Sequence, residues 1–170
     1  AKLGLSATVW AEALRTVLVL VHIGVTAAWL GAMLYSIVVV QPRLAEFFTE
    51  AGDREDFATV LAAGARWKVL GLAAALAVSG AGLTAIELGE AESPSDAWTA
   101  LVVAKTVLLT AATALFAYVS WRLWPARLLA HMSGSPDLAR IRGRFRVIAV
   151  ALTALIAGGL VAGVISDAVR

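Results

Sequence analysis

Four stretches of this sequence contain almost no charge, and they limit the possible folds more than any other feature. Residues 16–40, 69–86 and 147–165 carry no charged side chain, and residues 98–119 carry only Lys105. As helices these four stretches are about 37, 27, 28 and 33 Å long, at about 1.5 Å per residue. Because the hydrocarbon core of a bilayer is about 30 Å thick, each stretch can cross it.

Composition agrees with this interpretation. Of 170 residues, 61% are apolar and 15% are charged, whereas a soluble domain has about 45–50% and about 25%. These values exclude a disordered chain, a coiled coil and a soluble α/β enzyme. Backbone groups inside a bilayer must be hydrogen-bonded within the segment, and the alternation of barrel strands is missing, so the spans are helices. We predict one all-α domain over residues 1–170, an integral membrane four-helix bundle with short interfacial helices.

The segments between and before the spans carry further predictions. Residues 1–15 favour a short interfacial helix, and we expect the first span to be retained rather than cleaved as a signal peptide, because it is long and follows Glu12 and Arg15. Residues 43–65 indicate helical extensions beyond the bilayer. Residues 133–137 favour a turn, followed by a short basic helix at the lipid headgroups.

Charge in the flanking segments predicts the orientation. Segments 41–68 and 120–146 lie on one side of a four-helix bundle and hold ten basic residues, whereas the other side holds Lys2, Arg15 and Arg170 and an acidic loop at residues 87–97. Basic loops stay in the cytoplasm. We therefore expect a multi-pass protein of the inner (cytoplasmic) membrane with both termini outside. Since the basic residues flank the spans, they do not indicate a nucleic-acid partner.

Two side chains within the predicted spans, a histidine and a lysine, stand out because a charge is costly in the bilayer. His22 is six residues inside the first span and Lys105 is about seven residues inside the third. These two helices run in the same direction, so both residues lie about 9–10 Å below the outer boundary. A charged lysine there costs about 2.5–3.5 kcal/mol. They either share one cavity, or Lys105 snorkels to the interface while His22 makes a helix-packing hydrogen bond.

A stripe on the first span could line such a cavity. His22, Thr26, Trp29 and Met33 follow helical spacing and share one face. Small residues lie at the same depth on the second and fourth spans: Ser79, Gly80, Gly82, Thr84, Gly158 and Gly159. Small residues either allow close helix packing or make room for a flat ligand.

The ligand chemistry that this setting favours is that of haem b, with copper as the other choice. An imidazole can be an axial ligand of haem, next to an aromatic wall and a cation for the propionates. Copper(I) prefers several Met, Cys or His ligands. The chain has no cysteine, two histidines and two methionines. Met33 is about 16 Å along the helix from His22, so both cannot bind one ion.

Short motifs in all four helices resemble those of CopD-like copper-resistance membrane domains. The motifs are VHIGVTAAWLGAML at residues 21–34, QPRL at 41–44, RWK at 66–68, SG at 79–80, VAKTVLL at 103–109 and RFR at 144–146. The family has a His, a Trp-x-Gly and a Pro-Arg-Leu-like exit in its first helix, and a lysine in its third. The resemblance implies a four-helix membrane fold that takes part in copper handling.

The HemJ-type protoporphyrinogen oxidases are similar in the same places. They pair a first-helix His with a third-helix Lys and have a Pro-Arg-Leu exit. The resemblance implies that His22 and Lys105 are linked to haem and to activity, as the matching residues are in that family. HemJ-like proteins have a further His shortly after the exit, where this chain has AEFF at residues 45–48.

Three functions remain open at this point. The first is copper or haem handling at one metal or haem site in the outer half of the bundle. The second is a HemJ-like haem-dependent oxidase that passes electrons to quinone, so an enzyme is one of the alternatives. The third is a structural accessory subunit that packs against other membrane subunits or a second copy. In the first, His22 is the ligand and the following residues complete the site: Lys105, Trp29, Thr26, Gly158 and Gly159.

Overall fold

The computed structural model describes residues 2–90 and 94–168, and the side chains of these except residues 2–8, 51 and 166–168. Over these ranges it is built from helices and turns, with no strand, which confirms the predicted all-α class. Two elements, η1 and η2, are π-helical turns. The elements in order are α1 (Lys2–Tyr35), η1 (Ser36–Val40), α2 (Gln41–Phe47), α3 (Ala51–Ala62), α4 (Ala65–Glu90), α5 (Asp96–Tyr118), η2 (Val119–Leu123), α6 (Trp124–Met132) and α7 (Leu138–Ala168).

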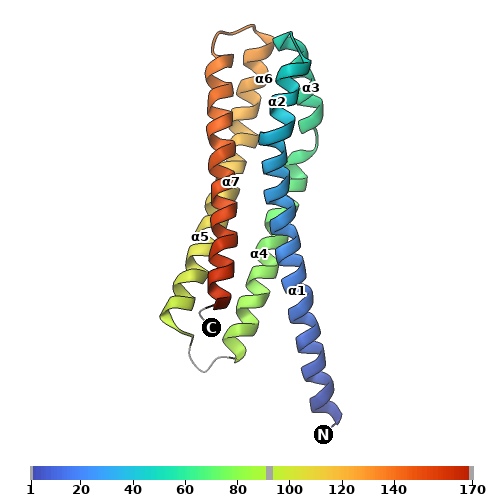
Figure 1. Cartoon of the computed structure of the whole chain (residues 1–170), viewed down its shortest axis with the longest axis vertical. Helices are drawn as coiled ribbons and strands as arrows, with labels where there is room; N and C mark the ends of the chain where they lie inside the picture. Colours follow the sequence, from blue (N-terminus) through green and yellow to red (C-terminus); the bar gives the residue numbers. More distant parts are fainter. Residues whose placement is uncertain (1, 91–93, 169–170) are drawn as a thin grey trace.

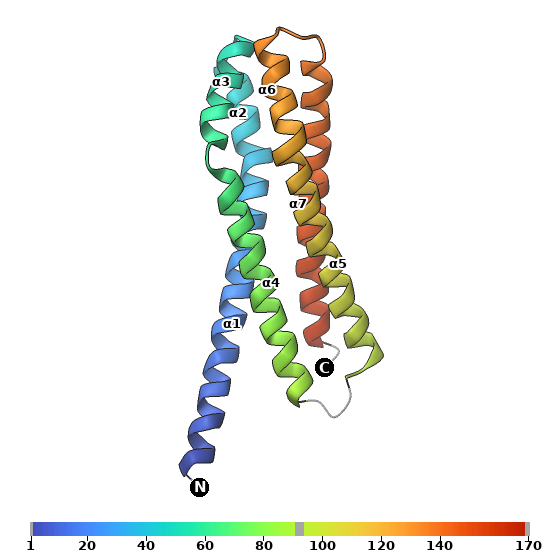
Figure 2. The same cartoon turned by 180° about the vertical axis from the view of Figure 1, so that it is seen from behind.

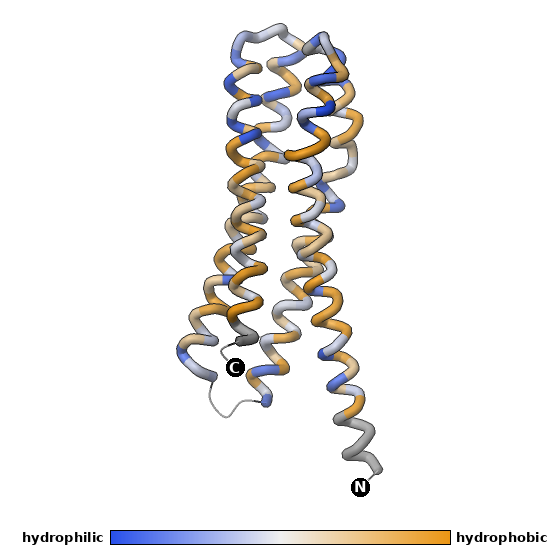
Figure 3. Tube along the Cα trace, viewed as in Figure 1, coloured by the Kyte–Doolittle hydropathy of each residue, from blue (hydrophilic) through white to orange (hydrophobic). Residues whose placement is uncertain are grey.

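Four helical rods are long and apolar enough to cross a membrane. They are Val9–Phe47, Ala65–Glu90, Asp96–Met132 and Leu138–Ile165, of 39, 26, 37 and 28 residues. Each contains one of the four uncharged stretches, so the predicted spans are confirmed. The first and third rods are about 58 and 55 Å long at about 1.5 Å per residue, longer than a hydrocarbon core. They continue through α2 and α6 into the polar end of the molecule (Figures 1 and 3).

Two boundary predictions are wrong. Residues 1–15 do not form a separate interfacial helix, because α1 runs without a break from Lys2 into the first span. The basic segment after the turn at residues 133–137 is not a separate short helix either, because α7 starts at Leu138 and continues through the fourth span; its predicted location at the headgroups stays a prediction. No proline follows in either helix, so the backbone hydrogen bonds continue across the change from polar to apolar sequence. The turn itself is confirmed, with Gly134 at a φ of +62°.

Proline shapes the two longest rods where they leave their apolar stretches. The N–H of Gln41 bonds to the Ser36 carbonyl, and the N–H of Trp124 bonds to the Val119 carbonyl, which are five-residue π-helical steps. In both cases the next residue is a proline. Proline has no N–H, and its ring crowds the preceding turn, so a wider turn relieves the crowding while the rod continues.

The bundle is built from two pairs of packed helices. The most extensive contacts join α1 with α4 and α5 with α7, and α1 also contacts α7 (Figures 1 and 2). Trp29 of α1 is 1% exposed and packs against Ala73 and Leu76 of α4 and Ile156 of α7. Leu109 of α5 packs against the same cluster, so Trp29 lies in the core to which all four rods contribute.

The two ends of the bundle differ in charge. The helices α2, α3, α6 and the start of α7 gather at one end, which we call the basic end (Figures 2 and 3). At the opposite end, Arg15 Nη2 lies 2.6 Å from Glu87 Oε1 and Arg15 Nη1 lies 3.4 Å from Glu90 Oε2, which joins α1 to α4. Other residues used in the charge comparison lie outside the described side chains: Lys2, Glu92 and Arg170.

The outer faces of the rods between these ends are apolar. Leu20 of α1 is 66% exposed, Val78 of α4 is 70%, Val107 of α5 is 60% and Val161 of α7 is 57%. Exposed apolar surface on every rod is unfavourable in water and suits the hydrocarbon of a bilayer. Together with rod length and hydropathy, it identifies a multi-pass membrane protein.

Candidate functional site

The stripe on α1 faces into the bundle, as its spacing predicts. Trp29 is 1% and Thr26 8% exposed, and His22 and Met33 are half-buried. Thr26 Oγ1 donates a hydrogen bond of 2.7 Å to the His22 carbonyl. Its hydroxyl proton is therefore used within α1, and Thr26 presents its methyl group and an acceptor oxygen to its surroundings.

The His22 ring is held by the second span. Its Nδ1 lies 2.9 Å from Ser79 Oγ. Ser79 is 2% exposed and donates its single hydroxyl proton to the Ala75 carbonyl at 2.7 Å. Because that proton is used, the Ser79 oxygen accepts from the Nδ1–H of His22. The neutral imidazole then carries its lone pair on Nε2, which is the state in which a histidine binds a metal.

Gly80 provides room for this ring. A Cβ atom built at Gly80 would lie 3.3 Å from His22 Cε1 and 3.8 Å from its Nδ1. A separation of 3.3 Å is tighter than an ordinary van der Waals contact. Ser79 and Gly80 were predicted only to lie at the same depth as His22. In the structure Ser79 is the hydrogen-bond partner of the ring, and Gly80 leaves the space that the ring occupies.

Lys105 lies on α5, in the other helix pair from His22. It is half-buried, and its positive charge acts on the His22 imidazole. That the two side chains line one cavity, as their equal depth predicts, stays a prediction.

The two α7 glycines of the predicted site differ from each other. A Cβ atom at Gly158 would lie 3.7 Å from Leu108 Cδ1, an ordinary contact, so this glycine helps α7 to pack against α5. A Cβ atom at Gly159 would have no described atom within 4 Å apart from its own turn of helix. The structure does not bring either glycine into contact with His22, and their role in lining a ligand stays a prediction.

A buried polar atom lies beside this stripe. Trp29 Nε1 has no hydrogen-bond partner within the described part of the chain, although the residue is 1% exposed. An indole N–H can only donate, and buried donors in native proteins are nearly always paired. The indole N–H of Trp29 is therefore a buried donor for which the described part of the chain provides no acceptor.

Haem b and copper make different demands on these groups. Haem needs an imidazole such as His22 for its iron and a cation such as Lys105 for its carboxylates. A copper ion needs several ligands on one centre. No cluster of three or more His, Cys, Asp or Glu that could hold a metal ion occurs among the residues with described positions.

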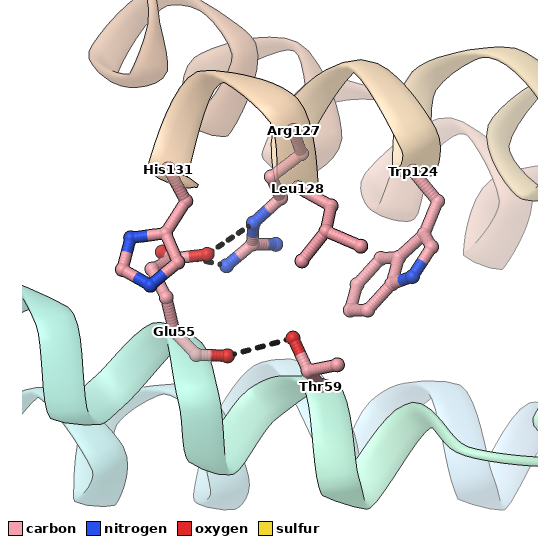
Figure 4. A pocket seen from close by; sticks show the side chains of 6 residues that line it. All are labelled: Glu55, Thr59, Trp124, Arg127, Leu128 and His131. Carbon is pink, nitrogen blue, oxygen red and sulfur yellow. Dashed lines mark hydrogen bonds and ion pairs between the residues drawn. The ribbon is translucent and has the colours of Figure 1, made fainter. Parts of the chain in front are cut away.

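Sequence reasoning missed a buried carboxylate at the basic end. Glu55 of α3 is 3% exposed. Arg127 of α6 donates to its two oxygens from Nε at 2.7 Å and Nη2 at 2.9 Å, and Arg142 of α7 donates from Nε at 2.7 Å (Figure 4 shows the Arg127 pair). Burial alone raises the pKa of Glu55, but the hydrogen bonds and charges of Arg127 and then Arg142 outweigh it, so the pKa lies below its ordinary value.

Aromatic rings and a histidine surround this ion-pair cluster. The Arg127 guanidinium lies 5.5 Å from the Trp124 ring centroid and 5.0 Å from that of Phe145. His131 is half-buried rather than fully at the surface, with Nε2 3.2 Å from Asp56 Oδ1. The sequence did show an excess of arginines at this end. Since a buried arginine needs a carboxylate partner, that excess was the signal for a buried acidic residue such as Glu55.

Comparison with known proteins adds no name to this arrangement. No protein-family model, curated protein or solved structure matches the chain. The likeness to the CopD-like and HemJ-type families therefore rests on the short motifs quoted above. The function has to be argued from the site.

Proposed function

We propose that this chain is a haem-handling protein of the inner membrane, in which His22 is the axial ligand of haem b. The observation that carries the proposal is the contact between His22 Nδ1 and Ser79 Oγ at 2.9 Å. A hydrogen-bond partner of this kind at Nδ1 fixes the ring and its tautomer, and leaves Nε2 for a metal. Gly80 leaves room for the ring to lie against α4 in this orientation.

Lys105 is a second residue that would bind the same haem. A half-buried ammonium at the depth of His22 stabilises a carboxylate such as a haem propionate, or is itself a second ligand in its neutral form. Thr26 and Trp29 form the wall, and Gly158 and Gly159 of α7 provide clearance on the other side. Bound haem supplies an iron that changes oxidation state, while the chain orients it and excludes water.

Haem-dependent oxidation of a porphyrinogen is the second candidate function. The pairing of His22 with Lys105 favours it, because it is the pair that the HemJ-type resemblance links to activity. A porphyrinogen carries carboxylates that an ammonium would bind. Electrons from this oxidation would pass to quinone in the bilayer.

The orientation follows from charge. Ten basic residues in segments 41–68 and 120–146 favour the cytoplasm for the basic end. Both termini are then on the outer side, and the His22 region lies in the outer half of the membrane. Partners other than lipid would be further membrane subunits or a second copy, which would bind the exposed apolar faces.

Absorption spectroscopy of the purified protein tests the proposal. We expect a Soret band from one haem b per chain, and we expect His22→Ala to lose it. His131→Ala is the matched control, because it removes the other histidine of the chain, at the basic end, and should keep the band. Copper without haem in metal analysis would favour copper handling. A protein with neither, stable only beside partner chains, would favour the accessory-subunit role.

A further inference from the structure

A polar groove at the basic end lies between the third rod and the start of α7. It has a volume of about 280 Å³. Three arginines line it: Arg122 from η2, and Arg140 and Arg144 from α7. Tyr118 and Asp137 are also in its wall. We call this feature the arginine groove. It is lined by three cations and one anion.

Two of the three arginines have no counter-charge. Arg140 Nη1 lies 3.4 Å from Asp137 Oδ1, which accounts for the one carboxylate. Neither Arg122 nor Arg144 makes an ion pair in the part of the chain that the structure describes. The wall of the groove therefore carries an excess of two positive charges, and the groove is large enough for a phosphate group.

Arginines on the opposite face of the same helices behave differently. Arg127 of α6 and Arg142 of α7 are both bound to Glu55. Thus both arginines on the side of α6 and α7 that faces α3 have a carboxylate partner within the chain, although they share it, whereas Arg122 and Arg144 on the groove side have none among the described residues. The difference indicates an anion from outside the chain at the groove.

The depth of the groove identifies the source of that anion. Arg122 lies three residues beyond the uncharged stretch 98–119, and Arg144 lies three residues before the stretch 147–165. Both are therefore about 4.5 Å beyond the apolar part of their helices. Headgroups occupy about 5–7 Å on each side of the hydrocarbon core, so the two guanidiniums lie at the level of lipid phosphates.

We propose that the arginine groove binds the headgroup phosphate of one anionic phospholipid. The forked guanidiniums of Arg122 and Arg144 hold the phosphate oxygens. The half-exposed ring of Tyr118, 47% exposed, lies at the glycerol level, as interfacial tyrosines do. Next along α7, Val147 is 69% and Val150 54% exposed, which provides apolar surface for the acyl chains. The site is independent of the His22 region.

Native mass spectrometry of the full-length protein tests this proposal, with phosphatidylglycerol and phosphatidylcholine as probes. The unsubstituted protein should retain one phosphatidylglycerol in preference to phosphatidylcholine. Arg122→Gln and Arg144→Gln should each weaken retention about tenfold or more, because each removes a charged hydrogen bond. Arg146→Gln is the matched control: it is an exposed arginine of the same helix that does not line the groove, and its effect should stay within about twofold.

Three results would overturn the proposal. One is equal retention of the two lipids. Another is a loss for Arg146→Gln as large as that for Arg144→Gln, which would show general attraction to negative lipid. The third is displacement of the lipid by inorganic phosphate at similar concentration, which would make the source a soluble anion. Thermal unfolding of each variant within a few degrees of the unsubstituted protein confirms that the fold is kept.

Discussion

Replacing Glu55 by glutamine should destabilise the protein more than the loss of any exposed carboxylate. Glutamine keeps the shape but leaves the guanidiniums of Arg127 and Arg142 without a counter-charge, and their side chains are only 14% and 27% exposed. Removing one partner of a buried ion pair costs about 3–5 kcal/mol. Because both arginines keep some solvent contact, and Arg127 keeps its two aromatic neighbours, we expect the lower value, about 3 kcal/mol.

Unfolding in detergent micelles by added dodecyl sulfate, followed by tryptophan fluorescence, measures this loss. The control is Glu46→Gln, because the Glu46 side chain is 69% exposed and lies 3.8 Å from Arg43, which is 80% exposed. An exposed pair of this kind is worth less than about 1 kcal/mol. If Glu55→Gln unfolds at the same denaturant concentration as Glu46→Gln, the ion-pair cluster does not hold the basic end together, and the reasoning from burial fails.

Three further predictions concern acid, space and hydrogen bonding. The pKa of Glu55 in the folded state lies below 4.5, so its ion pairs stabilise the protein fully above pH 4.5 and are lost as the pH falls through the lower value. Acid titration should therefore lower the stability of the native protein. An equal loss of stability with acid in Glu55→Gln would contradict this. Gly80→Ala puts a methyl group 3.3 Å from His22 and should weaken haem binding in an absorbance titration. Gly71→Ala is the control on the same helix, because an added Cβ there would meet nothing within 4 Å, and it should bind normally. Equal affinities would argue against an imidazole ligand. Ser79→Ala removes the acceptor for Nδ1–H and should lower haem affinity about tenfold or more in the same titration, and unchanged affinity would count against the assigned tautomer.

The spans could be predicted because their cause is local. A charged side chain in hydrocarbon is costly in any fold, so its absence over a whole stretch is visible in the sequence. The ends of the rods were not visible in this way. The third rod continues through Trp124 to Arg127, and Arg127 is bound there to Glu55 from a distant part of the chain. Contacts of this kind depend on tertiary structure.

The same distinction applies to the candidate site. His22, Thr26 and Trp29 lie on one helix, where spacing alone gives the shared face. The depth of Ser79 and Gly80 could be predicted as well. Their contact with His22 could not, because it depends on how α4 is rotated about its own axis, and its nearly uniform apolar sequence leaves that rotation undetermined.

The two π-helical turns change the angular phase of their rods. A π-turn holds about one residue more than an α-turn, and one residue corresponds to about 100° of rotation. Everything beyond Ser36–Val40 and Val119–Leu123 is therefore turned by more than a quarter of a circle relative to an uninterrupted helix. Leu44 and Ala130, each 8% exposed, lie beyond these two turns. Loss of one residue from either turn would rotate the following helix by about 100° while leaving composition and span length almost unchanged, so chain length at these two places governs which side chains meet at the basic end.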